Sequence, residues 1–68
     1  MRRNRQTSRS REIYFEHIAI GKAVKVSAID AASGTEVSIA GSRYASQEEL
    51  ERVALQKLLR AMSKKKGR

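Results

Sequence analysis

Residues 22–39, KAVKVSAIDAASGTEVSI, constrain the fold of this chain more than any other segment. Two runs of strand-forming residues flank the turn sequence AASG at 31–34, where Asp30 can accept a local backbone hydrogen bond and Gly34 can adopt a positive φ. Side chains alternate between the two faces of a strand, so a slip of one residue would move every one to the other face. A single register places five apolar residues on one face: Val24, Val26, Ala28, Val37 and Ile39. The segment therefore predicts a β-hairpin with one buried face.

A second hairpin precedes the first in the chain. The runs EIYFEHIAI (12–20) and AVKVSAID (23–30) are separated by Gly21 and Lys22. Glycine at the first of two loop positions suits a type II′ turn. The resulting register pairs Ile20 with Ala23, His17 with Val26, and Phe15 with Ala28. The three strands then form an antiparallel meander with the strand at 23–30 in the middle.

The register of the first strand has an alternative. The two-residue turn places Tyr14, Ile18, Ile20 and Ile29 on the face away from the core. A β-bulge near Glu16 and His17 would instead turn Ile18 and Ile20 inward and expose His17. The sequence favours the unbulged register without excluding the bulged one.

The apolar residues recur at helical spacing in residues 46–63, SQEELERVALQKLLRAMS. Ser46 is a typical N-cap, and Glu49 three residues later completes a capping-box pattern. Acidic residues follow this start, and basic residues occupy the other end, as the helix dipole favours. The predicted apolar stripe contains Leu50, Val53, Ala54, Leu58, Ala61 and Met62, widened by Leu55 and Leu59.

These elements predict an α+β fold, a three-stranded antiparallel meander packed against one C-terminal helix. The expected core on the sheet is Ile13, Phe15, Val24, Val26, Ala28, Val37 and Ile39. Residues 12–63 would form the single domain. Residues 1–11 lack apolar side chains after Met1 and cannot offset the entropy of ordering, so we expect a disordered basic arm. Residues 64–68 would form a basic tail.

The positive charge of the chain is concentrated at its two ends. The formal net charge is +8, yet residues 12–56 carry more acids than bases. Arginine and lysine in such segments suit a polyanion, with affinity that comes from counterion release. We therefore expect nucleic acid as a nonspecific, electrostatic partner. The candidate contacts are Arg2, Arg3, Arg5, Arg9, Arg11, Lys57, Arg60, Lys64, Lys65, Lys66 and Arg68.

No catalytic or metal-binding pattern is evident in the sequence. His17 has no Ser or Cys partner in a recognisable motif, and a structural role on its strand is the simpler interpretation. Glu12 and Glu16 would lie ~13 Å apart along a strand, which is too far for shared proton chemistry. The chain has no cysteine. We expect a cytoplasmic, non-enzymatic protein with no metal, no cofactor, no small-molecule substrate and no membrane partner.

A protein–protein interface is the alternative function. The outward residues Tyr14, Ile18, Ile20 and Ile29 would form an apolar patch, and such patches usually mark interaction surfaces. Domains of fewer than ~70–80 residues are commonly supported by oligomerisation when disulfides and metals are absent. We therefore also expect a homodimer that uses this open sheet face.

Three segments together resemble a small family of bacterial proteins that share a domain of unknown function: EIYFE, KVSAIDAASGTEVSI and ELERVALQKLL. The resemblance covers about residues 12–62, and the hairpin AIDxxSGTEV is its most recognisable part. It implies a bacterial cytoplasmic protein and contributes no catalytic residue. The arginine-rich start of the chain lies outside it.

Overall fold

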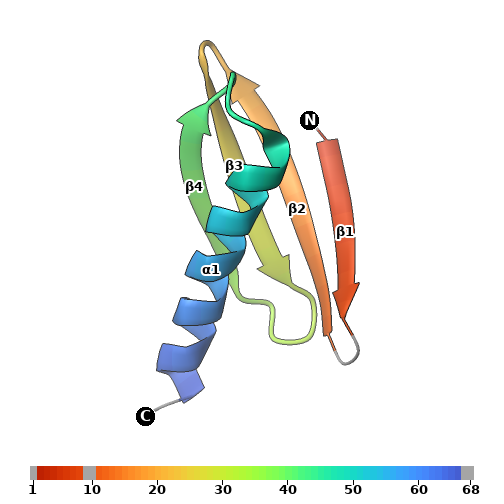
Figure 1. Ribbon diagram of the computed structural model, residues 1–68. Helices are drawn as coiled ribbons and strands as arrows, with labels where there is room; N and C mark the ends of the chain where they lie inside the picture. Colours follow the sequence, from red (N-terminus) through yellow and green to blue (C-terminus); the bar gives the residue numbers. More distant parts are fainter. Residues whose placement is uncertain (1, 9–10, 67–68) are drawn as a thin grey trace.

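The computed structural model describes the backbone of residues 2–8 and 11–66 and the side chains of residues 12–64. Within these ranges the chain forms one antiparallel sheet, in the order β1-β2-β3-β4, and one helix (Figure 1). The elements are β1 (Arg2–Ser8), β2 (Arg11–Ile20), β3 (Ala23–Asp30), β4 (Glu36–Ser42) and α1 (Gln47–Lys66). The predicted meander of three strands followed by a helix is present as β2, β3, β4 and α1.

The two predicted turns have the expected backbone conformation. Gly21 and Gly34 have φ values of 60° and 76°, in the region that favours glycine. Asp30 accepts hydrogen bonds through Oδ2 from the backbone N–H of Ser33 at 3.0 Å and from the Ser33 hydroxyl at 2.7 Å. The AASG turn is therefore held by the aspartate that precedes it.

The register of β2 is the unbulged one. Pairing with β3 is continuous from Ile13 opposite Asp30 to Ile20 opposite Ala23. His17 therefore faces the helix and is buried, with 6% of its surface exposed. The bulged alternative, which would have exposed His17, does not occur.

A fourth strand replaces the disordered arm that the sequence predicted. β1 pairs antiparallel with β2 along its whole length, from Arg2 opposite His17 to Ser8 opposite Arg11. Side-chain burial alone favours disorder for this polar segment. Backbone hydrogen bonds to the outer edge of β2 can place a polar segment in a sheet without any apolar residue.

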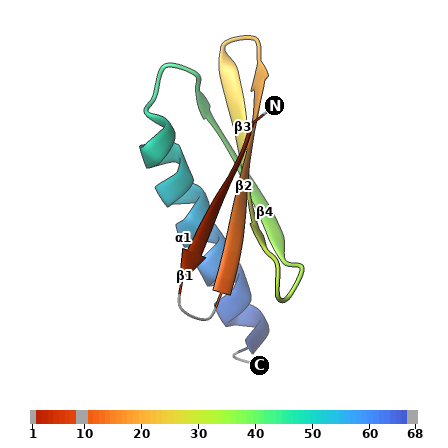
Figure 2. The same cartoon turned by 90° about the vertical axis from the view of Figure 1, so that its right-hand side faces the viewer.

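The helix covers one face of the sheet and leaves the other uncovered (Figure 2). It lies over β3 and β4. The buried core consists of Ile13, Phe15, Val26 and Ala28 from the sheet with Ala54 and Leu58 from the helix, and Val24, Val37, Ile39, Leu50, Leu55 and Met62 pack around it. The predicted core of the sheet is thus confirmed. Two members of the predicted helix stripe are not buried, because Val53 and Leu59 are 45% and 42% exposed.

The helix begins where the sequence indicated and ends later. The hydroxyl of Ser46 accepts a hydrogen bond from the backbone N–H of Glu49 at 3.0 Å, which confirms the predicted N-cap. At the other end α1 continues to Lys66. Residues 64–66 are therefore helical rather than part of a tail, because cations in the last turn favour the helix dipole.

Candidate functional site

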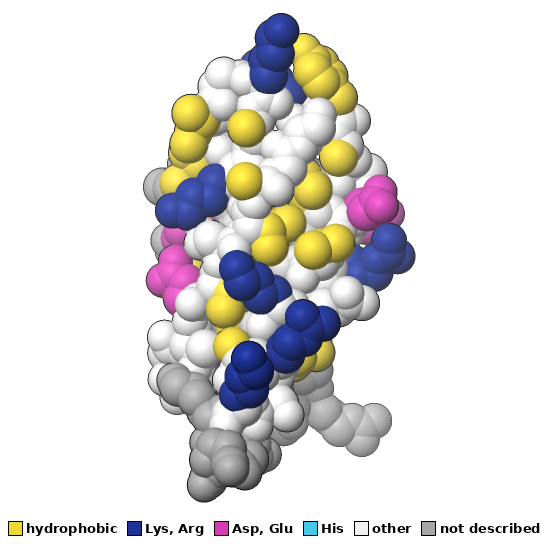
Figure 3. Space-filling model, turned by 90° about the vertical axis from the view of Figure 1, so that its left-hand side faces the viewer, with side chains coloured by type: hydrophobic (Ala, Val, Ile, Leu, Met, Phe, Trp, Pro, Cys, Tyr) yellow, Lys and Arg dark blue, Asp and Glu magenta, His cyan; other side chains and the backbone are white. Residues whose placement is uncertain are grey.

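Three basic residues line one side of the second half of α1. Lys57, Arg60 and Lys64 are three and four residues apart, so their side chains leave the helix in nearly the same direction. The Lys57 ammonium donates a hydrogen bond to the backbone carbonyl of Ser38 in β4 at 2.8 Å, which fixes this side of the helix next to β4. We call these three residues the basic stripe. Lysine and arginine side chains gather on the corresponding face in Figure 3.

The remaining predicted polyanion contacts are described less completely. Arg2, Arg3 and Arg5 lie in β1, and Arg11 begins β2. Lys65 and Lys66 are the last residues of α1. Only the backbone of these six residues is described, and Arg9 and Arg68 lie outside the described residues.

The topology brings Arg11, at the start of β2, to the same end of the molecule as the end of α1. The end of β1, the start of β2 at Arg11 and the end of α1 all lie there, and the two ribbon views agree (Figures 1 and 2). Arg11 and the basic stripe thus lie toward the same end of the molecule, whereas Arg2 and Arg3 lie further along β2, opposite His17 and Glu16. This proximity arises because β2 and α1 run in opposite directions. The sequence alone does not show it.

The predicted protein interface lies on the uncovered face of the sheet, which we call the outer face. Tyr14, Ile18 and Ile29 are half-buried there, and Ile20 is 62% exposed. Glu16 and Lys25 lie on the same face by their alternation with the inward residues. The structure thus brings together the four apolar residues of the predicted interface and intersperses them with charges.

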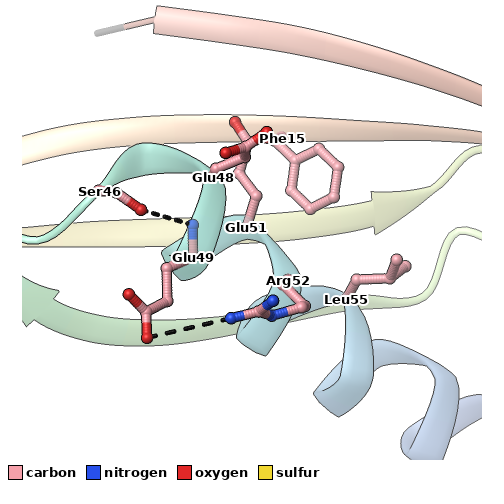
Figure 4. Close-up of a pocket in the computed structure, with 7 residues that line it drawn as sticks. All are labelled: Phe15, Ser46, Glu48, Glu49, Glu51, Arg52 and Leu55. Carbon is pink, nitrogen blue, oxygen red and sulfur yellow. Dashed lines mark hydrogen bonds and ion pairs between the residues drawn. The ribbon is translucent and has the colours of Figure 1, made fainter.

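A hollow of about 500 Å³ lies beside the start of the helix (Figure 4). Glu49 lies on one side of it and approaches Arg52 at 4.0 Å, an exposed pair that contributes little stability. Glu48 and Glu51 extend toward Phe15 in the close-up. The hollow is lined by Phe15, Ser46, Glu48, Glu49, Glu51, Arg52 and Leu55. This lining contains carboxylates but no thiol or imidazole, and its one hydroxyl already caps the helix.

His17 forms a buried contact that the sequence did not reveal. Its Nε2 lies 3.1 Å from Oε2 of Glu51, whose side chain is 13% exposed. The pair joins β2 to the first half of α1. A second hollow of about 370 Å³ adjoins the histidine and is lined by His17, Ala19, Val24, Arg43, Ala45, Gln47 and Leu50. A contact between residues 34 positions apart becomes predictable only when the helix is placed on the sheet.

Metal clusters and membrane-spanning helices are two further classes of site. No group of three or more His, Cys, Asp or Glu side chains there could hold a metal ion. No helix within residues 2–8 and 11–66 is both long and apolar enough to span a bilayer.

Comparison with known proteins identifies the chain by family alone. No curated protein matches it, and no solved structure matches it. A family model described as a domain of unknown function (DUF6898) matches residues 10–66, which include β2, β3, β4 and α1. The predicted resemblance is therefore confirmed, and the chain belongs to the DUF6898 family.

Proposed function

We propose that this chain is a non-enzymatic protein of the bacterial cytoplasm. It binds nucleic acid through the basic stripe and through Arg11 at the same end of the molecule. The observation that carries the proposal is the alignment of Lys57, Arg60 and Lys64 on one side of α1. Helical residues at this spacing present several cations to one polyanion at once. Each neutralised phosphate releases counterions, which supplies affinity without base recognition.

Arg11 adds a further positive charge at the same end of the molecule. Arg11 begins β2 at the end of the molecule where α1 finishes, as the ribbon views illustrate (Figures 1 and 2). An extended polyanion that contacts the basic stripe can therefore also reach the start of β2. The side chains described for the domain include few aromatics, so stacking of single-stranded bases contributes less than phosphate contact.

A structural role is the competing explanation for the basic stripe. Cations in the last turns of a helix stabilise it by about 0.3–1 kcal/mol each through the helix dipole. The two roles predict different measurements. Helix stabilisation changes the free energy of unfolding when charge is removed from the helix end. Nonspecific phosphate binding changes the salt-dependent affinity for nucleic acid.

The test compares two triple variants with the same net charge. One is Lys57→Gln with Arg60→Gln and Lys64→Gln, and its control is Lys22→Gln with Lys25→Gln and Arg52→Gln, which removes three cations elsewhere. Binding to a fluorescent duplex is measured at two salt concentrations. We expect the stripe variant to lose affinity far more than the control. Equal losses would assign binding to net charge alone, and no salt-dependent binding by the parent chain would end the proposal.

A second candidate function is self-association through the outer face. It is favoured by the exposure of Ile20 beside the half-buried Tyr14, Ile18 and Ile29 on a face that no described element covers. Sedimentation at 0.15 M salt tests it, with Ile18→Lys and Ile29→Lys as disruptive variants. A dimer that both substitutions dissociate supports this interface. A monomer near the chain mass of 7.6 kDa at high micromolar concentration rejects it.

A further inference from the structure

The second hollow, which we call the His17 hollow, has a buried imidazole in its wall. Its volume is about 370 Å³, and it lies between β2, β3 and the start of α1. Only 6% of the His17 surface is exposed, and Nδ1 has no hydrogen-bond partner among the described residues. A buried polar atom without a partner destabilises a fold unless a water or a ligand bonds to it. The imidazole therefore marks this hollow as a place where a polar group can bind.

The contact between His17 and Glu51 determines which kind of group Nδ1 can bind. Nε2 lies 3.1 Å from Oε2 of Glu51, as an ion-pair contact rather than an aligned hydrogen bond. A carboxylate accepts protons from a donor and has none to give, so the contact favours a proton on Nε2. Nδ1 is then an acceptor in the neutral ring and a donor in the imidazolium. A hydroxyl group fits both cases, because it donates and accepts.

Arg43 supplies a positive charge at the other end of the hollow, which it also lines. Its Nη1 donates a hydrogen bond to the backbone carbonyl of Gly21 at 3.0 Å, and its backbone N–H donates to the carbonyl of Lys22 at 3.1 Å. These two bonds fix the arginine beside the turn that joins β2 to β3. A guanidinium has five N–H donors in a planar fork, so the bond to Gly21 leaves donors that can bind a carboxylate.

Apolar side chains line the space between these two polar ends. Ala19 lies opposite Val24 in the sheet, and Leu50 lines the hollow from α1. Ala19 is two residues from His17 on the same face of β2, a distance of about 7 Å along the strand. β1 pairs with β2 only as far as His17, so no described strand lies beside Ala19 on that edge. The hollow thus has a hydrogen-bonding group and a cation at opposite ends of a short apolar stretch.

We infer that the His17 hollow binds a small hydroxy acid, whose carboxylate pairs with Arg43 and whose hydroxyl bonds to Nδ1 of His17. The apolar body of the acid packs against Ala19 and Leu50. A small ligand is required, because the volume is near the lower end of the ~300–1,000 Å³ that ligand pockets span. Nδ1 lies just beneath the surface of the hollow, so the hydroxyl reaches it by displacing the flexible end of the half-buried Leu50. The site lies at the start of α1, away from the basic stripe, and is independent of nucleic-acid binding.

The first experiment compares three probes on the parent chain. Para-hydroxyphenylacetate carries both groups, phenylacetate lacks the hydroxyl, and tyrosol lacks the carboxylate. Titrations followed by the amide signals in nuclear magnetic resonance spectra measure each dissociation constant. We expect the first probe to bind at about 1 mM or tighter, and each of the others at least about fivefold more weakly. Equal binding of the two acids would overturn the site, because nonspecific attraction to a cationic chain depends on the carboxylate alone. Absence of binding by the first probe would overturn it as well.

The second experiment tests the cationic end of the hollow. Arg43→Gln is compared with Arg52→Gln, which removes one cation elsewhere, so the two variants have the same net charge. We expect Arg43→Gln to bind para-hydroxyphenylacetate and tyrosol about equally, whereas Arg52→Gln keeps the preference for the acid. The spectrum of each variant verifies that it is folded. A preference that survives in Arg43→Gln would overturn the proposed site.

The third experiment tests the imidazole end. His17→Asn keeps an amide near the position of Nδ1, and His17→Gln keeps one near the position of Nε2, because the two side chains differ in length by one carbon. We expect His17→Asn to retain the preference for para-hydroxyphenylacetate over phenylacetate and His17→Gln to lose it. A preference that is unchanged in His17→Gln would overturn the proposed site. The comparison of probes on the parent chain decides the proposal even if neither variant folds.

Discussion

Leu50 of α1 packs directly against Gly41 of β4, so closely that a Cβ at position 41 would lie 2.6 Å from Cδ2 of the leucine. The contact sets the distance between helix and sheet near the start of α1. It also fixes the side of the helix that faces the β4 edge. Glycine is thus required here for close approach rather than for backbone conformation.

Replacing Gly41 by alanine should destabilise the domain by about 1 kcal/mol, the low end for an overpacked site, because the clashing atom is the end of a flexible side chain. Urea unfolding measures the loss. Combining Gly41→Ala with Leu50→Ala should cost less than the sum of the single changes, since the second removes the clash. Additive costs would mean that the two residues are not in contact.

The N-cap gives a second prediction. Ser46→Ala removes the acceptor for the Glu49 amide and should cost about 0.5–2 kcal/mol. Ser63→Ala is the matched control, because Ser63 is an exposed serine inside the same helix and alanine is a better helix former. We expect the control to be neutral or slightly stabilising in thermal unfolding. Equal effects of the two substitutions would contradict the assignment of the cap.

The buried contact between His17 and Glu51 should couple strongly. Replacing one partner leaves a buried polar group without its contact, at a cost of about 1–3 kcal/mol. A double-mutant cycle with His17→Leu and Glu51→Leu measures the coupling, and the exposed pair Glu49 and Arg52 supplies the comparison. We expect the buried pair to couple by more than 0.5 kcal/mol beyond the exposed one, whose coupling is of order 0–1 kcal/mol. Similar couplings would show that burial adds nothing to this contact.

Much of this fold was readable from the sequence, and particular residues show why. Gly21 and Gly34 marked turns that require positive φ, and the two-residue turn at Gly21 favoured the observed partners of Phe15 and His17 over a bulged register. β1 was missed because RRNRQTS contains no apolar residue and is held by backbone pairing. Val53 fits the helical period but is exposed, because the position of α1 over β3 and β4 leaves its side uncovered.

The candidate site was predictable in part. The spacing of Lys57, Arg60 and Lys64 is visible in the sequence, and so is their place in the second half of the helix. The bond from Lys57 to Ser38 and the shared pole with Arg11 depend on tertiary packing. The outer face followed from the register alone, since alternation along β2 and β3 places its residues without knowledge of the helix.

Deletion of residues 1–10 tests the role of β1. Every buried core residue among the described side chains follows position 12, so the domain should remain folded. We expect a loss of no more than about 2 kcal/mol, because cross-strand pairs contribute ~0.2–1 kcal/mol each and the entropy of ordering offsets part of this. Circular dichroism and urea unfolding measure it. A chain that unfolds after the deletion would show that the β1–β2 pairing is essential to the sheet.

The salt dependence of duplex binding tests the central claim most directly. The slope of log K against log salt concentration is measured for the parent chain and for the variant with Lys57, Arg60 and Lys64 replaced by glutamine. If the basic stripe contacts phosphate, the slope of the variant should be shallower by about 2–3, since each lost contact changes it by ~0.9. Equal slopes for the two chains would contradict the account, because the stripe would then make no contact with nucleic acid.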